Sequence, residues 1–176
     1  MKRFVILLLA LGVVLSLSAC SGQPGAPVAD ILSKVKDAIK DDMLAQGMSE
    51  QDFKEGLPGF IEADLIADET DMYFTDPEIL DKTKIAEGAV LAPMFNINSD
   101  EIIILKAKDK SAVEALEASL QKEKENRLKQ WETYLPAQHE KVKNTVIKVS
   151  GLYLLYGTYR DASVIEGAFD LALSGK

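Results

Sequence analysis

Few side chains in this sequence have the type and spacing that catalysis or metal binding requires. The chain contains one cysteine, Cys20, and one histidine, His139. A single cysteine excludes a disulfide framework and any paired-cysteine metal site. No Gly-x-Ser-x-Gly segment supplies a nucleophile for His139, and no glycine-rich phosphate loop is present. We therefore expect no catalytic residues, no metal and no cofactor, and we expect His139 to be solvated or locally hydrogen-bonded.

A run of acidic residues raises the alternative of a calcium site. Ca²⁺ binds roughly six to eight oxygen ligands, from a loop with fixed spacing and a glycine at its turn. This segment has no glycine and no Asp-x-Asp-x-Asp-Gly pattern, so we favour a solvated acidic loop. Its acidic residues are Asp64, Asp68, Glu69, Asp71, Asp76, Glu78 and Asp81.

Three tyrosines and one glutamate are further candidates. Alternation along a strand places Tyr153 and Tyr159 on one face and Tyr156 on the other. Exposed, Tyr153 and Tyr159 would form a contact surface, because aromatic residues are enriched at interaction hot spots. The alternative is that they belong to the core. Glu101 begins a strongly apolar strand, where it is either a paired functional carboxylate or, as we expect, the solvated end of the strand.

The first 20 residues have the order of a secretory signal. Met1-Lys2-Arg3 is basic, residues 5–17 form an apolar run, and Ser18-Ala19 is small. The run is too short for a stable bilayer-spanning helix, which needs about 20 residues. Leu17-Ser18-Ala19-Cys20 resembles a bacterial lipobox. This resemblance implies that the Cys20 thiol receives a diacylglyceryl group and that cleavage makes Cys20 the new N-terminus; the alternative is a free cysteine after an unrelated cleavage.

Lipidation of Cys20 predicts a protein anchored in the cell membrane on its extracytoplasmic face. Two acyl chains anchor a protein stably in a bilayer, whereas a single chain binds the bilayer only reversibly. The net charge of the whole chain is −8, and removal of residues 1–19 takes away two basic residues and no acid. We therefore expect no nucleic-acid partner and no basic patch that helps the lipid to hold the membrane.

The chain divides into three parts. Residues 1–19 are the predicted signal peptide, and residues 20–27 are a tether rich in glycine, serine and proline. Residues 28–176 have the length and composition of a single domain.

Apolar spacing and capping signals predict the elements of this domain. Helices are predicted at 28–45, 49–55, 77–80, 111–135 and 136–143, and after Asp161. Strands are predicted at 60–67, 89–97, 101–106, 145–149 and 152–159.

Four details of these elements affect the fold. Residues 101–106 form a continuous apolar run, which predicts a central strand buried on both faces. Pro93 cannot donate to a strand ladder, so its strand lies at an edge or carries a bulge. Ser111 and Glu114 have the spacing of a capping box. The apolar stripe of the helix that follows is interrupted near Lys124.

Hairpins dominate the predicted order, and no strand–helix repeat is visible. This order favours the α+β class, with a mostly antiparallel sheet and helices packed on one face. The sequence also resembles a family of domains of unknown function, number 4358. The resemblance rests on residues 100–109, on Tyr134-Leu135-Pro136-Ala137-Gln138 and on Gly151-Leu152-Tyr153. It extends over residues 28–173, most clearly after Gly88, and implies a lipid-anchored envelope protein without known catalytic residues.

These observations lead to three functional hypotheses. The first is a non-enzymatic lipoprotein that binds another envelope component, most simply a protein. The second is a small-ligand binder, which requires an apolar pocket with convergent polar groups. The third is a hydrolase that uses carboxylates, which requires two acids facing each other in a cleft, at least one with a raised pKa.

Overall fold

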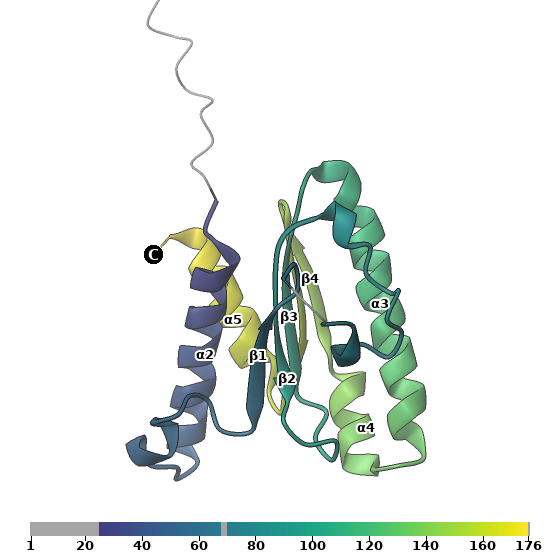
Figure 1. Ribbon diagram of the computed structural model, residues 1–176. Helices are drawn as coiled ribbons and strands as arrows, with labels where there is room; N and C mark the ends of the chain where they lie inside the picture. Colours follow the sequence, from purple (N-terminus) through teal and green to yellow (C-terminus); the bar gives the residue numbers. More distant parts are fainter. Residues whose placement is uncertain (1–24, 68–69, 176) are drawn as a thin grey trace, which may run out of the picture.

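A five-stranded antiparallel sheet forms the middle layer of the described residues, which are 25–67 and 70–175 in this computed structural model (Figure 1). Its strands are β1 (Phe60–Asp64), β2 (Ile85–Pro93), β3 (Glu101–Ala107), β4 (Val146–Ser150) and β5 (Tyr153–Thr158). They lie in the order β1-β2-β3-β5-β4, and every neighbouring pair is antiparallel. The predicted central position of β3 is therefore confirmed.

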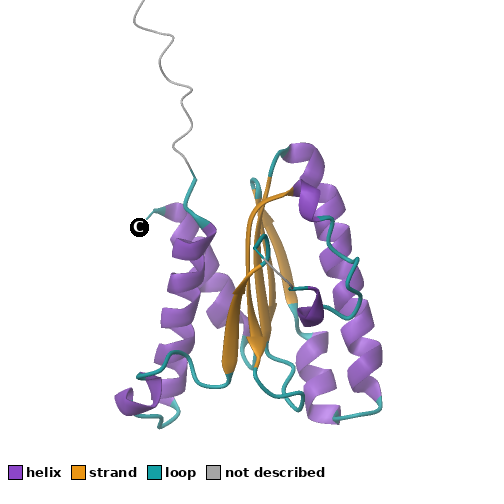
Figure 2. Cartoon of the chain, in the orientation of Figure 1, coloured by secondary structure: helices purple, strands orange, loops and turns teal. Residues whose placement is uncertain are grey.

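Four α-helices in the described residues cover both faces of this sheet (Figure 2). They are α2 (Val28–Ala45), α3 (Lys110–Glu132), α4 (Pro136–Lys143) and α5 (Ala162–Ser174). One face carries α2 and α5, and the other carries α3 and α4. The α+β class with an antiparallel sheet is confirmed, whereas the prediction that the helices pack on one face is wrong.

The composition of β3 explains why both faces are covered. Ile102 and Ile104 point to one side and join the apolar cluster of α2 and α5. Ile103 and Leu105 point to the other side and join the cluster of α3. All four side chains are fully buried. Burial of each contributes about 1.5–3 kcal/mol, which a helical layer on only one face would lose at every second position.

Most predicted helices are confirmed, with two local differences. The described part of the chain also contains three short 3₁₀ helices: Glu50–Phe53, Asp71–Tyr73 and Lys82–Lys84. Residues 76–80 form turns and bends rather than a helix. The Asp76 carboxylate accepts a hydrogen bond of 3.0 Å from the Glu78 backbone N–H, which stabilises a local turn. α3 is capped by Asp109, which accepts the Ala112 amide at 3.0 Å, and Ser111 donates to Asp109 instead of forming a capping box.

β2 is an interior strand that carries a bulge. β1 pairs with one of its sides and β3 with the other. The prediction that the strand lies at an edge is therefore wrong, and the pairing of β2 with β3 shifts between Ile85 and Glu87, away from the Pro93 position on which the alternative of a bulge rested. Pro93 is the last residue of β2.

The body has two ends, set by the direction of the strands. At the N-terminal end, Val28 donates its backbone N–H to Glu87 at 2.8 Å, near the start of β2. The opposite end, which we call the distal end, carries the loop after β2, the α3–α4 connection and the residues after β5 (Figure 1). From Glu87 to Pro93 the strand spans about 20 Å. Among the described residues, no helix has the length and apolarity needed to cross a bilayer.

Candidate functional site

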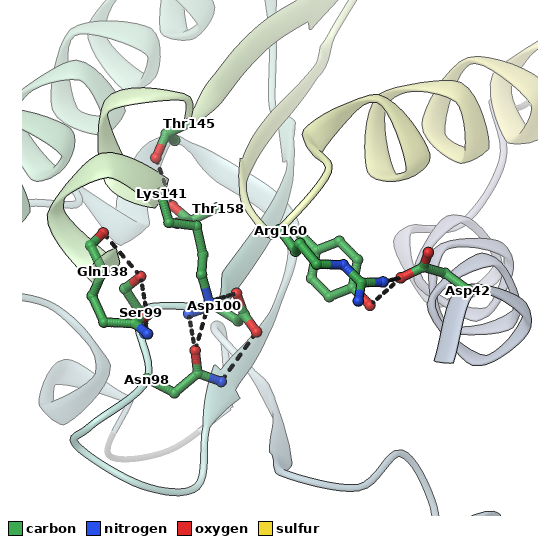
Figure 3. Close-up of polar contacts among 10 residues, drawn as sticks. Asp42, Asn98, Ser99, Asp100, Gln138, Lys141, Thr145, Thr158 and Arg160 are labelled. Atoms are coloured by element: carbon green, nitrogen blue, oxygen red, sulfur yellow. Dashed lines mark hydrogen bonds and ion pairs between the residues drawn. The ribbon is translucent and has the colours of Figure 1, made fainter. Parts of the chain in front are cut away.

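A cavity of about 400 Å³ opens at the distal end, where charged side chains from four segments converge (Figure 3). We call it the distal pocket. It is lined by Met43, Gln46, Met48, Asp100, Lys141, Tyr159 and Arg160. The lining comes from α2 and the residues after it, the start of β3, α4 and the residues after β5. No single stretch of sequence therefore contains the pocket.

Lys141 connects α4 to the loop before β3. Its Nζ lies 2.6 Å from Asp100 Oδ1 and 2.9 Å from Asn98 Oδ1. Asn98 in turn donates from Nδ2 to Asp100 Oδ2 at 3.1 Å. Asp100 is buried, so its charge needs these partners, because an unpaired buried carboxylate is strongly destabilising.

Ser99 and Gln138 fasten the same loop to α4. The Ser99 backbone N–H and its hydroxyl both donate to Gln138 Oε1, each at 2.9 Å. The hydroxyl therefore faces an amide oxygen, which is not a base that could activate it as a nucleophile. Lys141, the nearest amine, is engaged as an ammonium donor to Asp100. This part of the site is arranged for structural fastening rather than for nucleophilic catalysis.

Asp42 joins α2 to the other wall of the distal pocket. Tyr159 donates from Oη to Asp42 Oδ2 at 2.7 Å, and the Arg160 guanidinium contacts the same oxygen. Arg160 also lies over the Tyr159 ring, 5.9 Å from its centroid. Burial and the hydrogen bond to Asp42 raise the pKa of Tyr159, so the phenol stays protonated. Behind this wall, the hydroxyls of Thr145 and Thr158 share a buried hydrogen bond of 2.7 Å.

A second polar cluster lies buried under α3. Arg127 bridges two carboxylates, with Nη2 at 2.7 Å from Glu101 Oε1 and Nε at 2.8 Å from Glu123 Oε1. Glu101 is 2% exposed and Glu123 is 0% exposed. Burial raises the pKa of Glu101 to about 7 even though the Arg127 guanidinium favours the charged form. The expectation that Glu101 is a solvated strand end is wrong, since the side chain turns inward and is paired.

This cluster also fixes the segment that precedes β2. Thr75 donates its backbone N–H and its hydroxyl to Glu123, the latter at 2.6 Å. Arg127 donates to the Tyr73 carbonyl oxygen at 2.6 Å. Sequence reasoning missed Glu123 as a buried carboxylate and Arg127 as its partner. The available signal was the interruption of the apolar stripe near Lys124, where a buried carboxylate takes the place of an apolar side chain.

Exposed apolar side chains also occur in two connections at the distal end of the body. Met94, Phe95 and Ile97 of the β2–β3 loop are 51%, 61% and 60% exposed, and Tyr134 of the α3–α4 connection is 55% exposed. We call these four residues the distal patch. The hydrogen bonds from Ser99 to Gln138 fasten the β2–β3 loop to α4, the helix that follows the α3–α4 connection.

The candidate residues named from the sequence do not form a common site in the structure. Tyr153 and Tyr159 share a face as predicted, but both are buried against α2 and α5 and present no exposed aromatic surface. Tyr156 joins the opposite cluster. His139 is only partly exposed and lies on α4. Cys20 lies outside the described residues.

The acidic segment is only partly described. Asp68 and Glu69 lie outside the described residues. Asp64 accepts the backbone N–H of Ile66 at 2.8 Å, and Asp81 pairs with Lys84 at 2.8 Å. Nowhere in residues 25–67 and 70–175 do three or more metal-ligating side chains gather into a site that could hold an ion.

The comparison with known families matches the middle of the chain. Residues 79–158 fit the model of a domain of unknown function, DUF4358. The match contains the five distal side chains Asn98, Ser99, Asp100, Gln138 and Lys141, and it ends before Tyr159 and Arg160. It is shorter than the resemblance over residues 28–173, so one wall of the distal pocket lies outside the matched DUF4358 region. Searches of curated proteins and of solved structures gave no significant match.

Proposed function

We propose that this protein is a lipid-anchored extracytoplasmic component of the bacterial envelope that binds another envelope protein through its distal end. The observation that carries this proposal is the distal patch. Met94, Phe95, Ile97 and Tyr134 lie at the end opposite to the one that holds residues 25–28. Clustered, exposed apolar side chains mark interaction sites, because water-exposed apolar surface gains free energy when a partner covers it.

The direction of the chain supports the choice of a protein partner over the bilayer. If Cys20 carries the lipid, residues 20–24 join it to the first described residue and reach at most roughly 18 Å. Val28 contacts Glu87 near the start of β2, and the distal patch follows the other end of this strand, about 20 Å or more away. The patch then lies at the end of the body farther from the point of attachment to the membrane. Its apolar side chains would be covered by a partner and not by lipid.

The groups around the patch suit a protein interface. Interfaces combine an apolar centre with a polar rim, and arginine and aromatic residues are enriched in them. Here Arg160 and Lys141 line the distal pocket, and the hydrogen bond from Ser99 to Gln138 fastens the loop that carries Phe95 and Ile97 to α4. The fixed loop lowers the entropy that a partner must remove on binding.

One observation favours a second candidate, small-ligand binding. The distal pocket, at about 400 Å³, lies in the size range of ligand sites and brings two cations and a tyrosine together. Both cations are paired, Lys141 with Asp100 and Arg160 with Asp42, so a ligand would have to displace or bridge these pairs. The hydrolase hypothesis gains no support, because the close carboxylates Glu101 and Glu123 are buried and bridged by Arg127.

Two variants test the proposal in cells that produce the tagged full-length chain. Cys20→Ser should prevent lipidation and release the protein from the membrane or leave it as uncleaved precursor. Phe95→Ser with Ile97→Ser should stay membrane-bound and lose a crosslinked partner. Met72→Ser is the matched control, because Met72 is exposed and belongs to the segment before β2 rather than to either distal loop. Equal crosslinking by all three lipidated proteins would overturn the distal contact.

A further inference from the structure

Lysine residues gather at the N-terminal end of the body, although the whole chain has a net charge of −8. Two short segments, 82–84 and 106–110, supply them, and Lys108 donates its backbone N–H to the Lys84 carbonyl oxygen at 2.9 Å. We call these residues the N-terminal lysine cluster: Lys82, Lys84, Lys106, Lys108 and Lys110.

Three acids within or beside these segments are already engaged. Asp81 pairs with Lys84 at 2.8 Å, and Glu87 pairs with Lys106 at 2.6 Å. Asp109 caps the first turn of α3. All four side chains of these pairs are partly exposed, so the ammonium groups of Lys84 and Lys106 remain accessible to solvent.

The excess positive charge of this end comes from Lys108 and Lys110. Both are exposed, and neither forms an ion pair with another described residue. They flank Asp109, whose carboxylate accepts the Ala112 amide at 3.0 Å and the Ser111 hydroxyl at 2.6 Å. Asp109 is therefore turned toward the helix start and leaves both ammonium groups to solvent.

One member of the cluster, Lys106, lies beside the point where residues 25–28 join the body, and Lys108 and Lys110 follow it along the chain at the same end of β3. Tyr153 donates from Oη to the Ala26 carbonyl oxygen at 2.8 Å, and the Lys106 ammonium lies 5.5 Å from the centre of the Tyr153 ring. Glu87 contacts both Lys106 and the Val28 amide. A lipid on Cys20 would hold this end of the body within roughly 18 Å of the membrane surface, even with residues 20–24 fully extended.

We propose that the N-terminal lysine cluster binds the anionic headgroups of the membrane that holds the lipid anchor, and thereby sets the orientation of the body. This inference rests on the proposed lipidation of Cys20. A lysine ammonium on a flexible stem is a suitable point charge for a lipid phosphate. The attraction of one lysine to an anionic surface changes the equilibrium constant for membrane contact roughly fivefold. It extends about 8–10 Å at physiological salt, and a short tether keeps the body near enough for such contact.

The orientation has a consequence for the other end. With Lys108 and Lys110 on the headgroups, the distal patch is presented away from the bilayer instead of sampling all directions around the tether. The overall acidic charge does not oppose this arrangement, because the field at a surface is set by the nearest charges and is screened beyond about 10 Å.

The experiment uses the full chain, extracted from membranes in detergent and reconstituted into vesicles. A fluorophore on Ser150→Cys, at the end of β4, reports energy transfer to a dye in the lipid surface. Vesicles of phosphatidylcholine are compared with vesicles that also contain phosphatidylglycerol. The test variant is Lys108→Ala with Lys110→Ala, and the charge-matched control is Lys54→Ala with Lys129→Ala, two exposed lysines outside the cluster.

For the wild type and the control, energy transfer should be higher on vesicles that contain phosphatidylglycerol than on pure phosphatidylcholine. This increase should be several-fold smaller in the test variant. Added salt should reduce the increase in the wild type. Equal transfer from the test and control variants would overturn the inference. Failure to associate with pure phosphatidylcholine vesicles would instead count against the lipid anchor. In that case sedimentation with phosphatidylglycerol vesicles still decides: binding by the control but not by the test variant supports the cluster, and equal binding overturns it.

Discussion

The Tyr153 hydroxyl donates a hydrogen bond to the Ala26 carbonyl oxygen at 2.8 Å, across a sequence separation of 127 positions. This bond fixes the direction in which the chain leaves the body before α2. A side chain at Gly25 has no room, because a Cβ there would lie 2.1 Å from the same hydroxyl. The N-terminal end of the body is therefore a fixed junction, which matters for any protein held through residues upstream of it.

Tyr153→Phe tests this junction. Removal of the hydroxyl leaves the Ala26 carbonyl without its donor and should lower the free energy of unfolding by about 0.5–1.5 kcal/mol. Amide hydrogen exchange should accelerate at the start of α2 and remain unchanged in β3. Tyr134→Phe is the control, since Tyr134 is exposed. Unchanged exchange in Tyr153→Phe would show that the hydrogen bond does not hold the junction.

Glu101 predicts a specific pH dependence of stability. Burial raises its pKa from 4.5 to about 7 in the folded state, so between these values the folded protein binds more protons than the unfolded chain. The stability from this group is fully present below pH 4.5 and is lost as the pH rises toward 7, by at most about 1.4 kcal/mol per pH unit. Urea unfolding of Glu101→Gln should lack this slope, and Glu125→Gln, exposed on α3, should retain it. An identical slope in Glu101→Gln would contradict the assignment.

Arg127 is predicted to be the most sensitive position of the buried cluster. Arg127→Met removes the only cation that contacts both Glu101 and Glu123 among the described residues. Breaking a buried pair in this way costs about 3–5 kcal/mol, because charge is left uncompensated. Lys129→Met, an exposed position on the same helix, should stay within about 0.5 kcal/mol of the wild type. Similar unfolding midpoints for the two variants would show that Arg127 does not stabilise the fold.

The distal patch should contribute little to folding. Phe95→Ser with Ile97→Ser should change the free energy of unfolding by less than about 0.5 kcal/mol per site, because both side chains are already exposed. Thermal unfolding checks this. A large loss of stability would mean that these side chains pack in the folded protein and are not free for a partner.

Local patterns in the sequence predicted much of the fold. The helix at residues 28–45 and the helix at residues 136–143 have the predicted bounds, because apolar periodicity and the position of Pro136 are local signals. The continuous apolar run of residues 101–106 predicted the central strand. The same run contained the evidence against helices on one face only, since a strand that is apolar on both sides needs cover on both sides.

The candidate site could not be predicted in the same way. The distal pocket joins Asp42, Asp100, Lys141 and Arg160, whose proximity depends on the sheet order and on how α2 packs beside α5. No periodicity encodes that proximity. Net charge was similarly uninformative about the lysine cluster, because a sum over the chain hides that segments 82–84 and 106–110 are neighbours. For Tyr159 the sequence left a contact surface and a core position open, and the structure shows a buried ring whose hydroxyl donates to Asp42.

The most direct test of the central proposal is site-specific photocrosslinking in intact cells, with a photoreactive amino acid at Phe95 and, as the matched control, at Met72. Both positions are exposed, and they lie in different parts of the body. The account predicts that the probe at Phe95 captures a defined envelope protein, that the probe at Met72 does not, and that Cys20→Ser abolishes the capture. No protein adduct at Phe95, or the same adducts from both positions, would contradict it.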